Sequence, residues 1–374
     1  MKKIFIIAFI LLVILTAALV IYNLFFKGPP GGSNATPTPT QSATPSPGAS
    51  VPGALRAISQ EKAMAPVIGG NGKTVKYYSR QNGRVFESDF LGQNIKQISD
   101  TDLKNLAKII WSPDGEKVVG VFSEGNQIKK YFYDYETRQS SALNQNVGWV
   151  AFSPDSKNIA YQYTDPTAGQ SNISVSSPDG SNWRNIFKTR IDDLIVEWPS
   201  REKISIRTKT SGLAQGLLYA IEEKSGNFYK ILSDTFGLSV NWSPKADNLI
   251  FSYTDSSGKN PQLALADEKG EKTKNLNLKG IADKCVWSKD NFTIFCALPQ
   301  SFSDLDVWPD DYYKGLIVLN DAIYKIDLET DQKTKIAGSP DQAGFDAQDL
   351  FLSPQEDYLF FVNQKDGRLY SLKL

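Results

Sequence analysis

Acidic and aromatic side chains that could bind a ligand together concentrate in two stretches of this chain. The first, residues 298–321 (LPQSFSDLDVWPDDYYKGLIVLND), includes Asp304, Asp306, Trp308, Asp310, Asp311, Tyr312 and Tyr313. The second, residues 339–349 (SPDQAGFDAQD), adds Asp341, Phe345, Asp346 and Asp349. Exposed aromatic rings can stack on sugars or hold a cationic peptide, and neighbouring carboxylates can bind Ca²⁺. These residues are the candidate ligand-binding set, and the alternative is a solvated loop that packs its own aromatics against the domain.

Catalysis by a histidine-assisted nucleophile is excluded, because the chain contains no histidine. The same absence removes histidine-ligated metal sites. A glycosidase needs only two carboxyl groups, about 5–5.5 Å apart in a retaining enzyme, with one pKa raised by burial. A glycan-cleaving hydrolase or lyase that uses carboxylates of residues 298–321 therefore stays open as the alternative to a binding function.

The first 53 residues are predicted to lie outside the folded domain. Residues 4–26 carry no charge over 23 positions, and about 20 apolar residues suffice to span a bilayer. Lys2 and Lys3 precede them, which predicts a cytoplasmic N-terminus and an uncleaved transmembrane signal anchor within residues 1–27. A cleaved signal peptide is the competing interpretation, but its apolar region would be shorter, about 7–15 residues. Residues 28–53, rich in Pro, Thr, Ser and Gly, are expected to be a disordered linker.

One sequence unit recurs seven times after residue 53. It consists of a large hydrophobic residue, a turn such as Ser-Pro-Asp-Gly, and a β-rich strand, and the turn residues supply the backbone angles of a tight hairpin. The hydrophobic anchors are Ile68, Trp111, Phe152, Trp198, Trp242, Trp287 and Leu352, spaced by 43, 41, 46, 44, 45 and 65 residues. Blades of β-propellers repeat about every 40–45 residues. The prediction is an all-β, seven-bladed propeller of four-stranded blades over residues 54–374.

The seventh unit ends at Leu374 after only three strands. Residues 54–59 (ALRAIS) match residues 94–99 (NIKQIS), which are expected to form the outer strand of the first unit. We therefore expect residues 54–59 to pair with residues 368–374, which closes the ring and covers a sheet edge. The tryptophans among the anchors share one phase of the repeat, so we interpret them as packing between neighbouring blades.

Both acidic stretches are expected on one face of this propeller. Residues 298–321 lie between the second and third strands of the sixth unit, and residues 339–349 connect the sixth unit to the seventh. These two kinds of link emerge on the same side of the blades, so the stretches should lie side by side. Long loops on a rigid scaffold often carry binding residues.

The repeat motif, W/F-S-P-D-G-K followed by a β-rich strand, resembles the WD-like repeats of the TolB-like β-propeller family and of the N-terminal propellers of prolyl oligopeptidase-type peptidases. Residues 111–117 carry it most fully, and the units together span residues 64–374. The resemblance implies a propeller fold but no site residues, because the motif builds hairpins. TolB-like proteins have six such blades and a preceding α/β domain, whereas seven units follow the apolar stretch here. The resemblance therefore concerns the repeats alone, and peptidase activity is not implied because the hydrolase domain is absent.

Cys285 and Cys296 are the two cysteines of the chain. They fall on the first and second strands of the sixth unit, which are hairpin neighbours. A disulfide would form in an oxidising compartment if the Cβ atoms approach to about 4 Å. Two buried free thiols are the alternative, and both interpretations stay open at this point.

The predicted function is that of a binding or scaffold module. It is expected to be anchored in a membrane through residues 4–26, with the propeller outside the cytoplasm, in a bacterial cell envelope. The expected partner is a cell-envelope protein or a glycan. A nucleic-acid partner is not expected, because 41 Lys and Arg balance 41 Asp and Glu and leave no basic excess for phosphates. No catalytic residue or metal ligand is assigned, and Ca²⁺ at the acidic loops is the only cofactor considered.

Overall fold

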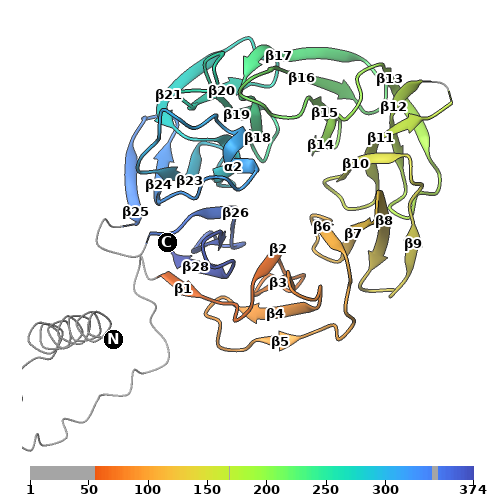
Figure 1. The fold of residues 1–374 in the computed structure, drawn as a ribbon, viewed down its shortest axis with the longest axis horizontal. Helices are drawn as coiled ribbons and strands as arrows, with labels where there is room; N and C mark the ends of the chain where they lie inside the picture. The colour runs from red at the N-terminus through yellow and green to blue at the C-terminus, as the bar shows by residue number, and fades with distance from the viewer. Residues whose placement is uncertain (1–54, 168, 339–343) are drawn as a thin grey trace, which may run out of the picture. The chain divides into compact units, whose positions relative to one another are not determined.

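Seven four-stranded antiparallel sheets surround a central axis in the computed structural model (Figure 1). The structure describes residues 55–167, 169–338 and 344–374. The predicted all-β propeller with seven four-stranded blades is confirmed. The predicted membrane anchor and linker, residues 1–27 and 28–53, lie outside the described residues. Within the part of the chain that is described, no helix is long and apolar enough to cross a membrane.

The strands of the first three blades follow the chain from the inside of the ring to its rim (Figure 1). Blade 1 contains β2 (Ala63–Ile68), β3 (Thr74–Ser79), β4 (Val85–Asp89) and β5 (Lys96–Gln97). Blade 2 contains β6 (Leu106–Trp111), β7 (Lys117–Glu124), β8 (Gln127–Asp134) and β9 (Ser140–Ala142). Blade 3 contains β10 (Val147–Phe152), β11 (Ile159–Asp165), β12 (Gln170–Ser176) and β13 (Arg184–Thr189).

The remaining blades keep this order, and blade 6 carries two short helices beside its strands. Blade 4 contains β14 (Ile195–Ser200), β15 (Lys203–Arg207), β16 (Gln215–Glu222) and β17 (Phe228–Phe236). Blade 5 contains β18 (Ser239–Trp242), β19 (Asn248–Tyr253), β20 (Gln262–Asp267) and β21 (Thr273–Lys279). Blade 6 contains the 3₁₀ helix η1 (Ala282–Lys284), β22 (Cys285–Trp287), β23 (Thr293–Pro299), α2 (Asp310–Tyr313), β24 (Asp321–Asp327) and β25 (Lys333–Ala337). Blade 7 contains β26 (Ala347–Leu352), β27 (Tyr358–Asn363), β28 (Leu369–Lys373) and β1 (Leu55–Ala57).

The two ends of the propeller meet in blade 7, as predicted. β1 pairs antiparallel with β28, with Leu55 opposite Leu372 and Ala57 opposite Tyr370. The backbone N–H of Ile58 extends this pairing by donating to the carbonyl of Leu369 at 2.8 Å. The N-terminal strand thus supplies the missing outer strand and covers the edge of β28.

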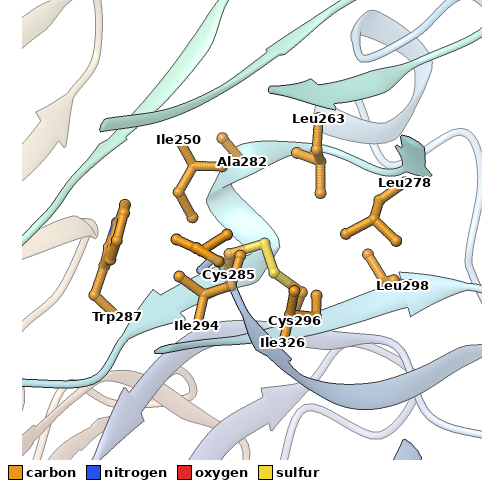
Figure 2. Close-up of a cluster of buried hydrophobic side chains, with 11 residues drawn as sticks. Ile250, Leu263, Leu278, Ala282, Cys285, Trp287, Ile294, Cys296, Leu298 and Ile326 are labelled. Atoms are coloured by element: carbon orange, nitrogen blue, oxygen red, sulfur yellow. A yellow bond between two sulfur atoms is a disulfide. The ribbon is translucent and has the colours of Figure 1, made fainter. Parts of the chain in front are cut away.

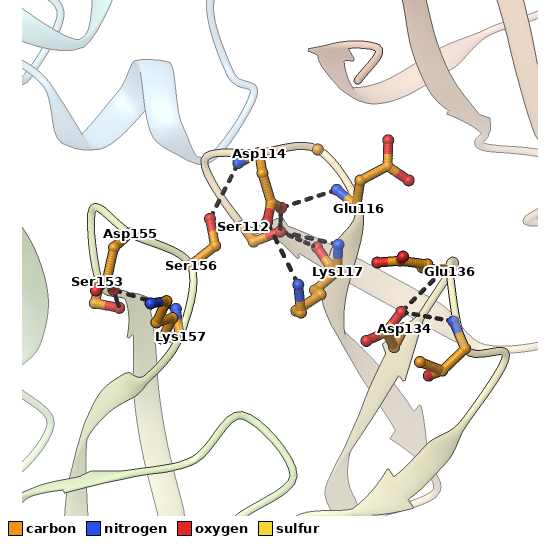
Figure 3. A network of polar contacts seen from close by, with 12 residues as sticks. Ser112, Asp114, Glu116, Lys117, Asp134, Glu136, Ser153, Asp155, Ser156 and Lys157 are labelled. Atoms are coloured by element: carbon orange, nitrogen blue, oxygen red, sulfur yellow. Dashed lines mark hydrogen bonds and ion pairs between the residues drawn. The ribbon is translucent and has the colours of Figure 1, made fainter. Parts of the chain in front are cut away.

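The Ser-Pro-Asp turns join the first and second strands of their blades and are stabilised locally (Figure 3). In blade 2, Ser112 Oγ donates to the Asp114 carboxylate and accepts from the Lys117 N–H at 2.9 Å. Although desolvation acts in the opposite direction, hydrogen bonds from Ser112 and Glu116 lower the pKa of Asp114. The turn also contacts the next blade, because the Asp114 N–H donates to Ser156 Oγ at 3.1 Å. These motif residues therefore build and connect hairpins, as the sequence indicated.

Seven hydrophobic clusters fill the spaces between neighbouring blades, including the space between blades 7 and 1. The repeated tryptophans belong to these clusters, and several are tied to the preceding blade through the indole N–H. Trp111 donates to the Ala65 carbonyl at 2.7 Å, and Trp287 donates to the Asn241 carbonyl at 3.1 Å. The interpretation of these tryptophans as inter-blade packing is confirmed.

A disulfide links the first two strands of blade 6. Cys285 of β22 lies directly opposite Cys296 of β23, and the two Cα atoms are 4.0 Å apart. Both residues are buried in the cluster between blades 5 and 6, beside Leu263 and Ile294 (Figure 2). Of the two alternatives that the sequence left open, the structure contains the disulfide.

Candidate functional site

The long insertion of blade 6 spans residues 300–320, because strand β23 ends at Pro299 and strand β24 begins at Asp321. The insertion is held by Trp308, which is 1% exposed and packs against Ile281, Tyr312 and Leu319 in a cluster separate from the blades. The backbone N–H of Trp308 donates to the Gly258 carbonyl of blade 5 at 2.7 Å. The peptide bond between Trp308 and Pro309 is cis. The insertion is therefore a folded element with its own small core.

Contacts with two neighbouring blades fix the position of the insertion. The Asp310 carboxylate, at the start of α2, accepts from Ser211 Oγ at 2.9 Å and from the Gly212 N–H at 2.7 Å, both in blade 4. Position 212 needs glycine, since a Cβ there would lie 2.0 Å from the Trp308 carbonyl oxygen. In blade 5, Lys259 Nζ donates to the carbonyls of Leu305 and Asp306. The insertion therefore joins blades 4, 5 and 6 on one face of the ring.

A buried charged network lies beneath the insertion and reaches blade 7. Lys284 Nζ is 2.6 Å from Asp346 Oδ1 and 2.9 Å from Asp321 Oδ2, and all three residues are almost fully buried. The Tyr312 hydroxyl accepts from Lys284 at 2.9 Å and donates to Asp346 at 2.8 Å. The Leu319 N–H donates to the second oxygen of Asp346. Residues 344–349 and the insertion therefore lie side by side, as predicted.

One ammonium group faces two carboxylates in this network. Desolvation by burial raises the pKa of Asp321, and the charge of Lys284 opposes that rise. Desolvation and the nearby Asp346 also raise the pKa of Tyr312, which keeps its hydroxyl a donor. One oxygen of Asp321, Oδ1, is buried without a hydrogen-bond partner. The network depends on Lys284, because this residue supplies the only positive charge among these buried groups.

The structure places the predicted ligand-binding residues in different environments. Those buried inside the protein are Trp308, Tyr312, Phe345 and Asp346. Those partly buried are Asp306, Asp310 and Asp311, and the carboxylate of Asp311 accepts from the Val307 N–H at 2.7 Å. Those exposed are Asp304, Tyr313 and Asp349, while Asp341 lies outside the described residues. For the four buried residues the structure supports the alternative interpretation, in which the loop packs against its own domain.

Tyr313 differs from the other insertion aromatics because it is exposed near the axis of the ring. Its hydroxyl donates to Asp283 Oδ2, and Asp283 also accepts from Ser239 Oγ at 2.9 Å. Desolvation raises the pKa of Tyr313 well above its ordinary value although solvent reaches the ring. Tyr313 is therefore an exposed ring of the insertion whose hydroxyl is held by Asp283.

Apart from Asp349, sequence reasoning missed the residues at one recurring position of the blades. The position lies three residues before each hydrophobic anchor, on the inner strand or, in blade 6, just before it. It is occupied by Ala65, Lys108, Trp149, Ile195, Ser239, Lys284 and Asp349. Lys108 Nζ lies 3.6 Å from the centre of the Trp149 ring on the next blade. The repeat itself contained the signal, because this position is polar, charged or tryptophan in five of the seven blades.

Charges from different blades influence one another around the axis. Desolvation lowers the pKa of Lys108, while Asp349, on blade 7, raises it. Desolvation raises the pKa of Asp349, and Arg80 and Lys108 oppose this shift. Desolvation likewise raises the pKa of Glu197. The positive charge of Arg207 opposes this rise, with Arg207 Nε 3.6 Å from Glu197 Oε1. Lys108 and Asp349 are thus exposed groups of opposite charge, and Trp149 and Tyr313 are exposed rings.

No group of three or more acidic or cysteine side chains is placed to hold a metal ion within the described ranges. The candidate Ca²⁺ ligands Asp304, Asp306, Asp310 and Asp311 thus form no such group. Asp310 and Asp311 instead accept hydrogen bonds that hold the insertion. The site therefore offers a face on which exposed apolar and aromatic side chains lie beside charges of both signs.

Comparison with known proteins shows the fold of this chain. No protein-family model and no curated protein matches it. Two similar solved structures are oligogalacturonate lyases, one in complex with manganese (13% identity, TM-score 0.60, covering 86% of this chain and 93% of that one) and one from Vibrio parahaemolyticus (10%, 0.60, 85% and 93%). A third is TolB from Acinetobacter baumannii (14%, 0.45, 74% and 63%). At these identities the likeness defines a class, the β-propellers, which agrees with the repeats.

Proposed function

We propose that this chain is a membrane-anchored, extracytoplasmic β-propeller that binds a cell-envelope protein through the face that carries the insertion. The observation that carries the proposal is the exposure of aliphatic side chains there. Leu305 is 89% exposed and Leu316 is 69% exposed, and Val318 and Leu213, beside the Gly212 contact, are also exposed. Contiguous exposed apolar patches mark interaction sites, and three of these four side chains belong to the one insertion. A glycan would leave such aliphatic groups without suitable contacts.

Exposed charged and aromatic side chains of the inner strands and of the insertion would supply the polar contacts of the proposed interface. Lys108 and Asp349 are accessible groups of opposite charge, and Tyr313 and Trp149 add exposed rings. Protein interfaces combine an apolar, aromatic centre with a polar surround. Because charges of both signs are present, we expect the partner to insert a polar segment that also carries both signs.

A glycan-cleaving hydrolase or lyase is the second candidate. The fold likeness to the oligogalacturonate lyases supports it only as a fold. Asp310 and Asp311 are poor catalytic groups, because both hold the insertion by hydrogen bonds. Glu197 and Asp349, whose pKa values are raised, are the better acid candidates. Release of unsaturated or reducing ends from polygalacturonate, lost on replacing either carboxylate by its amide, would favour this second function.

The predicted topology has a direct test. If residues 4–26 anchor the chain with its N-terminus in the cytoplasm, protease added to intact spheroplasts should digest the propeller. A cytoplasmic marker protein should survive in the same sample. Protection of the propeller until the membrane is lysed would contradict the extracytoplasmic location.

Partner capture tests the proposed interface. The full-length protein with Leu305→Asp and Leu316→Asp should capture at least about tenfold less partner from solubilised envelope membranes, because two charges would enter the apolar centre. Its melting temperature should stay within about 2 °C of the parent, since both side chains are exposed.

The matched control for partner capture is Phe292→Asp. Phe292 is also exposed, but it lies in the β22–β23 hairpin, at the opposite end of β23 from the insertion. This variant should capture the partner normally. Equal capture by the Leu305/Leu316 variant, or an equal loss in both variants, would contradict the assignment of this face.

A further inference from the structure

We propose that the protein binds a proline-rich segment of a partner in a tyrosine-lined groove between blades 1 and 2. The groove has a volume of about 640 Å³, which is in the usual range of ligand sites. Strand β8 of blade 2 forms one wall, and the link from β5 to β6 lies opposite, with Ile98, Asp100 and Leu103. The insertion contacts other blades, so this site does not depend on the interface proposed above.

The outer strand of blade 1 is very short, which opens this groove. β5 contains two residues, Lys96 and Gln97, whereas β13 and β17 at the rims of blades 3 and 4 contain six and nine (Figure 1). β5 pairs with β4 only at Phe86 and Glu87. The sheet of blade 1 therefore ends early and leaves the outer part of the facing sheet of blade 2 uncovered. Ile98, just after β5, is 41% exposed.

Three tyrosines form an aromatic stripe along the groove. Tyr131, Tyr133 and Tyr135 alternate along β8 and the residue after it, which places their side chains on one face. All three line the groove and are partly buried. On β7, Gly120 lies opposite Tyr131, and a Cβ at position 120 would lie 2.9 Å from the ring of Phe122. The Phe122 ring therefore lies against the backbone of Gly120 and adds a fourth ring to the wall.

Gly120 occupies a position that four other blades fill with an aromatic ring. The position lies two residues after the residue that pairs with the hydrophobic anchor of the blade, and the rings there are Tyr77, Tyr161, Phe251 and Phe361. Each of these rings is buried in the cluster between its blade and the preceding one. Glycine in blade 2 therefore leaves space beside blade 1 that a ring fills elsewhere, and a proline ring of a bound segment can occupy it.

Polar groups of the groove that have no partner in the protein favour a ligand that accepts hydrogen bonds. The hydroxyls of Tyr131 and Tyr133 and the guanidinium of Arg138 form no hydrogen bond or ion pair with any described residue, and solvent reaches both hydroxyls. A polyproline II segment matches them, because its backbone carbonyls make no internal hydrogen bonds. Proline also has no N–H that burial would leave unpaired. Aromatic-lined grooves commonly recognise this conformation.

Two exposed charges without an ion-pair partner mark opposite ends of the groove. Arg138 lies in the β8–β9 turn, on the side of the Ser-Pro-Asp turns, and Asp100 lies in the link between blades, on the opposite side. Tyr131 to Tyr135 spans about 13 Å at about 3.3 Å per strand residue, which is about four residues of polyproline II. We therefore expect a short proline-rich core with a basic residue at the Asp100 end and an acidic residue at the Arg138 end. A small aromatic compound is the competing occupant, but it would leave one of these charges unused.

Calorimetric titration of the full-length protein in lipid nanodiscs tests the groove with three acetylated and amidated peptides. Two contain the proline core, one for each chain direction: Lys-Pro-Thr-Pro-Pro-Glu and Glu-Pro-Pro-Thr-Pro-Lys. The third, Lys-Ala-Thr-Ala-Ala-Glu, keeps the charges without the prolines. We expect one proline peptide to bind with a Kd below about 1 mM. The alanine peptide should bind at least about fivefold more weakly, because it is not preorganised in the extended form.

Charge reversal at Arg138 locates the peptide. Arg138→Glu should weaken the bound peptide about fivefold or more, and the same peptide with Lys in place of Glu should recover most of the affinity. Tyr131→Ala should also weaken binding about fivefold or more, and its melting temperature reports whether the variant is folded. Arg190→Glu, at an exposed arginine of the link between blades 3 and 4, and the Leu305→Asp/Leu316→Asp variant should leave the affinity unchanged.

Four results would overturn the peptide site. One is no heat of binding with either proline peptide at millimolar concentration. Another is equal affinity for the alanine peptide, which would remove the preference for proline. The third is binding that neither Arg138→Glu nor Tyr131→Ala weakens, which would place the peptide elsewhere. The fourth is indole that binds in a Tyr131-dependent way while both proline peptides fail, which would make the groove a small-molecule site. Partner capture tests the insertion, so a failure there leaves these outcomes unaffected.

Discussion

Replacing Lys284 by methionine should destabilise the propeller by about 3–5 kcal/mol, because removing one partner of a buried ion pair leaves uncompensated charge. Asp321 and Asp346 are fully buried, and Lys284 contacts both. Methionine has a similar length, so the packing around the side chain changes little. Chemical denaturation of the full-length protein, followed by tryptophan fluorescence, measures the loss.

The pH dependence of this variant separates charge from packing. Burial already raises the pKa of Asp321, and the cation that opposes that rise is removed. When the folded-state pKa of an acid is raised, the destabilisation begins above the unfolded-state pKa and is complete above the folded-state pKa. The penalty should therefore be largest at neutral pH and should shrink as the pH falls toward about 4, the ordinary range of Asp. A penalty that does not change with pH would point to packing instead.

Two control variants are compared with Lys284→Met in the same stability measurement. Lys274→Met removes an exposed ion pair with Asp331 and should cost less than about 1 kcal/mol. Asp321→Asn leaves Lys284 paired with Asp346 alone and keeps an oxygen for the Ala347 N–H, so it should cost much less than Lys284→Met. If Lys284→Met is no more harmful than Lys274→Met, the buried network does not stabilise the fold.

Trp308→Ala should cost about 3–5 kcal/mol, the usual range for truncating a buried large aromatic residue. Trp308 is the centre of the small core of the insertion, so its loss should also release residues 300–320 to proteolysis. Denaturation midpoints measure the first effect, and limited proteolysis with mass mapping measures the second.

Leu316→Ala is the matched control for Trp308→Ala, because it lies in the same insertion but is exposed. It should change the stability by no more than about 0.5 kcal/mol. If Trp308→Ala instead leaves the stability nearly unchanged and abolishes partner capture, Trp308 would return to the ligand-binding residues. The two outcomes therefore decide between internal packing and direct binding for the residue that the sequence made most conspicuous.

The Lys284 and Trp308 contacts also explain how a loop of this length is held in one conformation. Ordering each residue costs roughly 1–2 kcal/mol, so an ordered insertion needs many contacts. Its contacts come from three directions: Gly212 of blade 4, Gly258 of blade 5 and Asp346 of the link to blade 7. The exposed aliphatic side chains proposed to bind a partner are thereby presented on a fixed surface.

The sequence alone was sufficient for the architecture, because the interactions that define a blade are local and repeated. The turn Ser112–Asp114 is stabilised by its own side chains, and the strands that it joins are hairpin neighbours. The anchor residues recur in one phase, so their inter-blade packing follows from the period. Even the closure by β1 was visible, since a three-stranded last unit needs a fourth strand and residues 54–59 have its pattern.

The candidate site could be located from the sequence only as a face, and the tertiary structure decided what each residue does there. Composition marked Trp308 and Tyr312 as candidates for binding, but their burial depends on Ile281 and Leu319, which the insertion meets only after the ring has formed. The disulfide likewise required the register that sets Cys285 opposite Cys296. Lys108 and Asp349 come from blades 2 and 7, so only closure of the ring brings their charges to one axis. Local periodicity determines which strands form, whereas exposure and charge pairing are properties of contacts between distant segments.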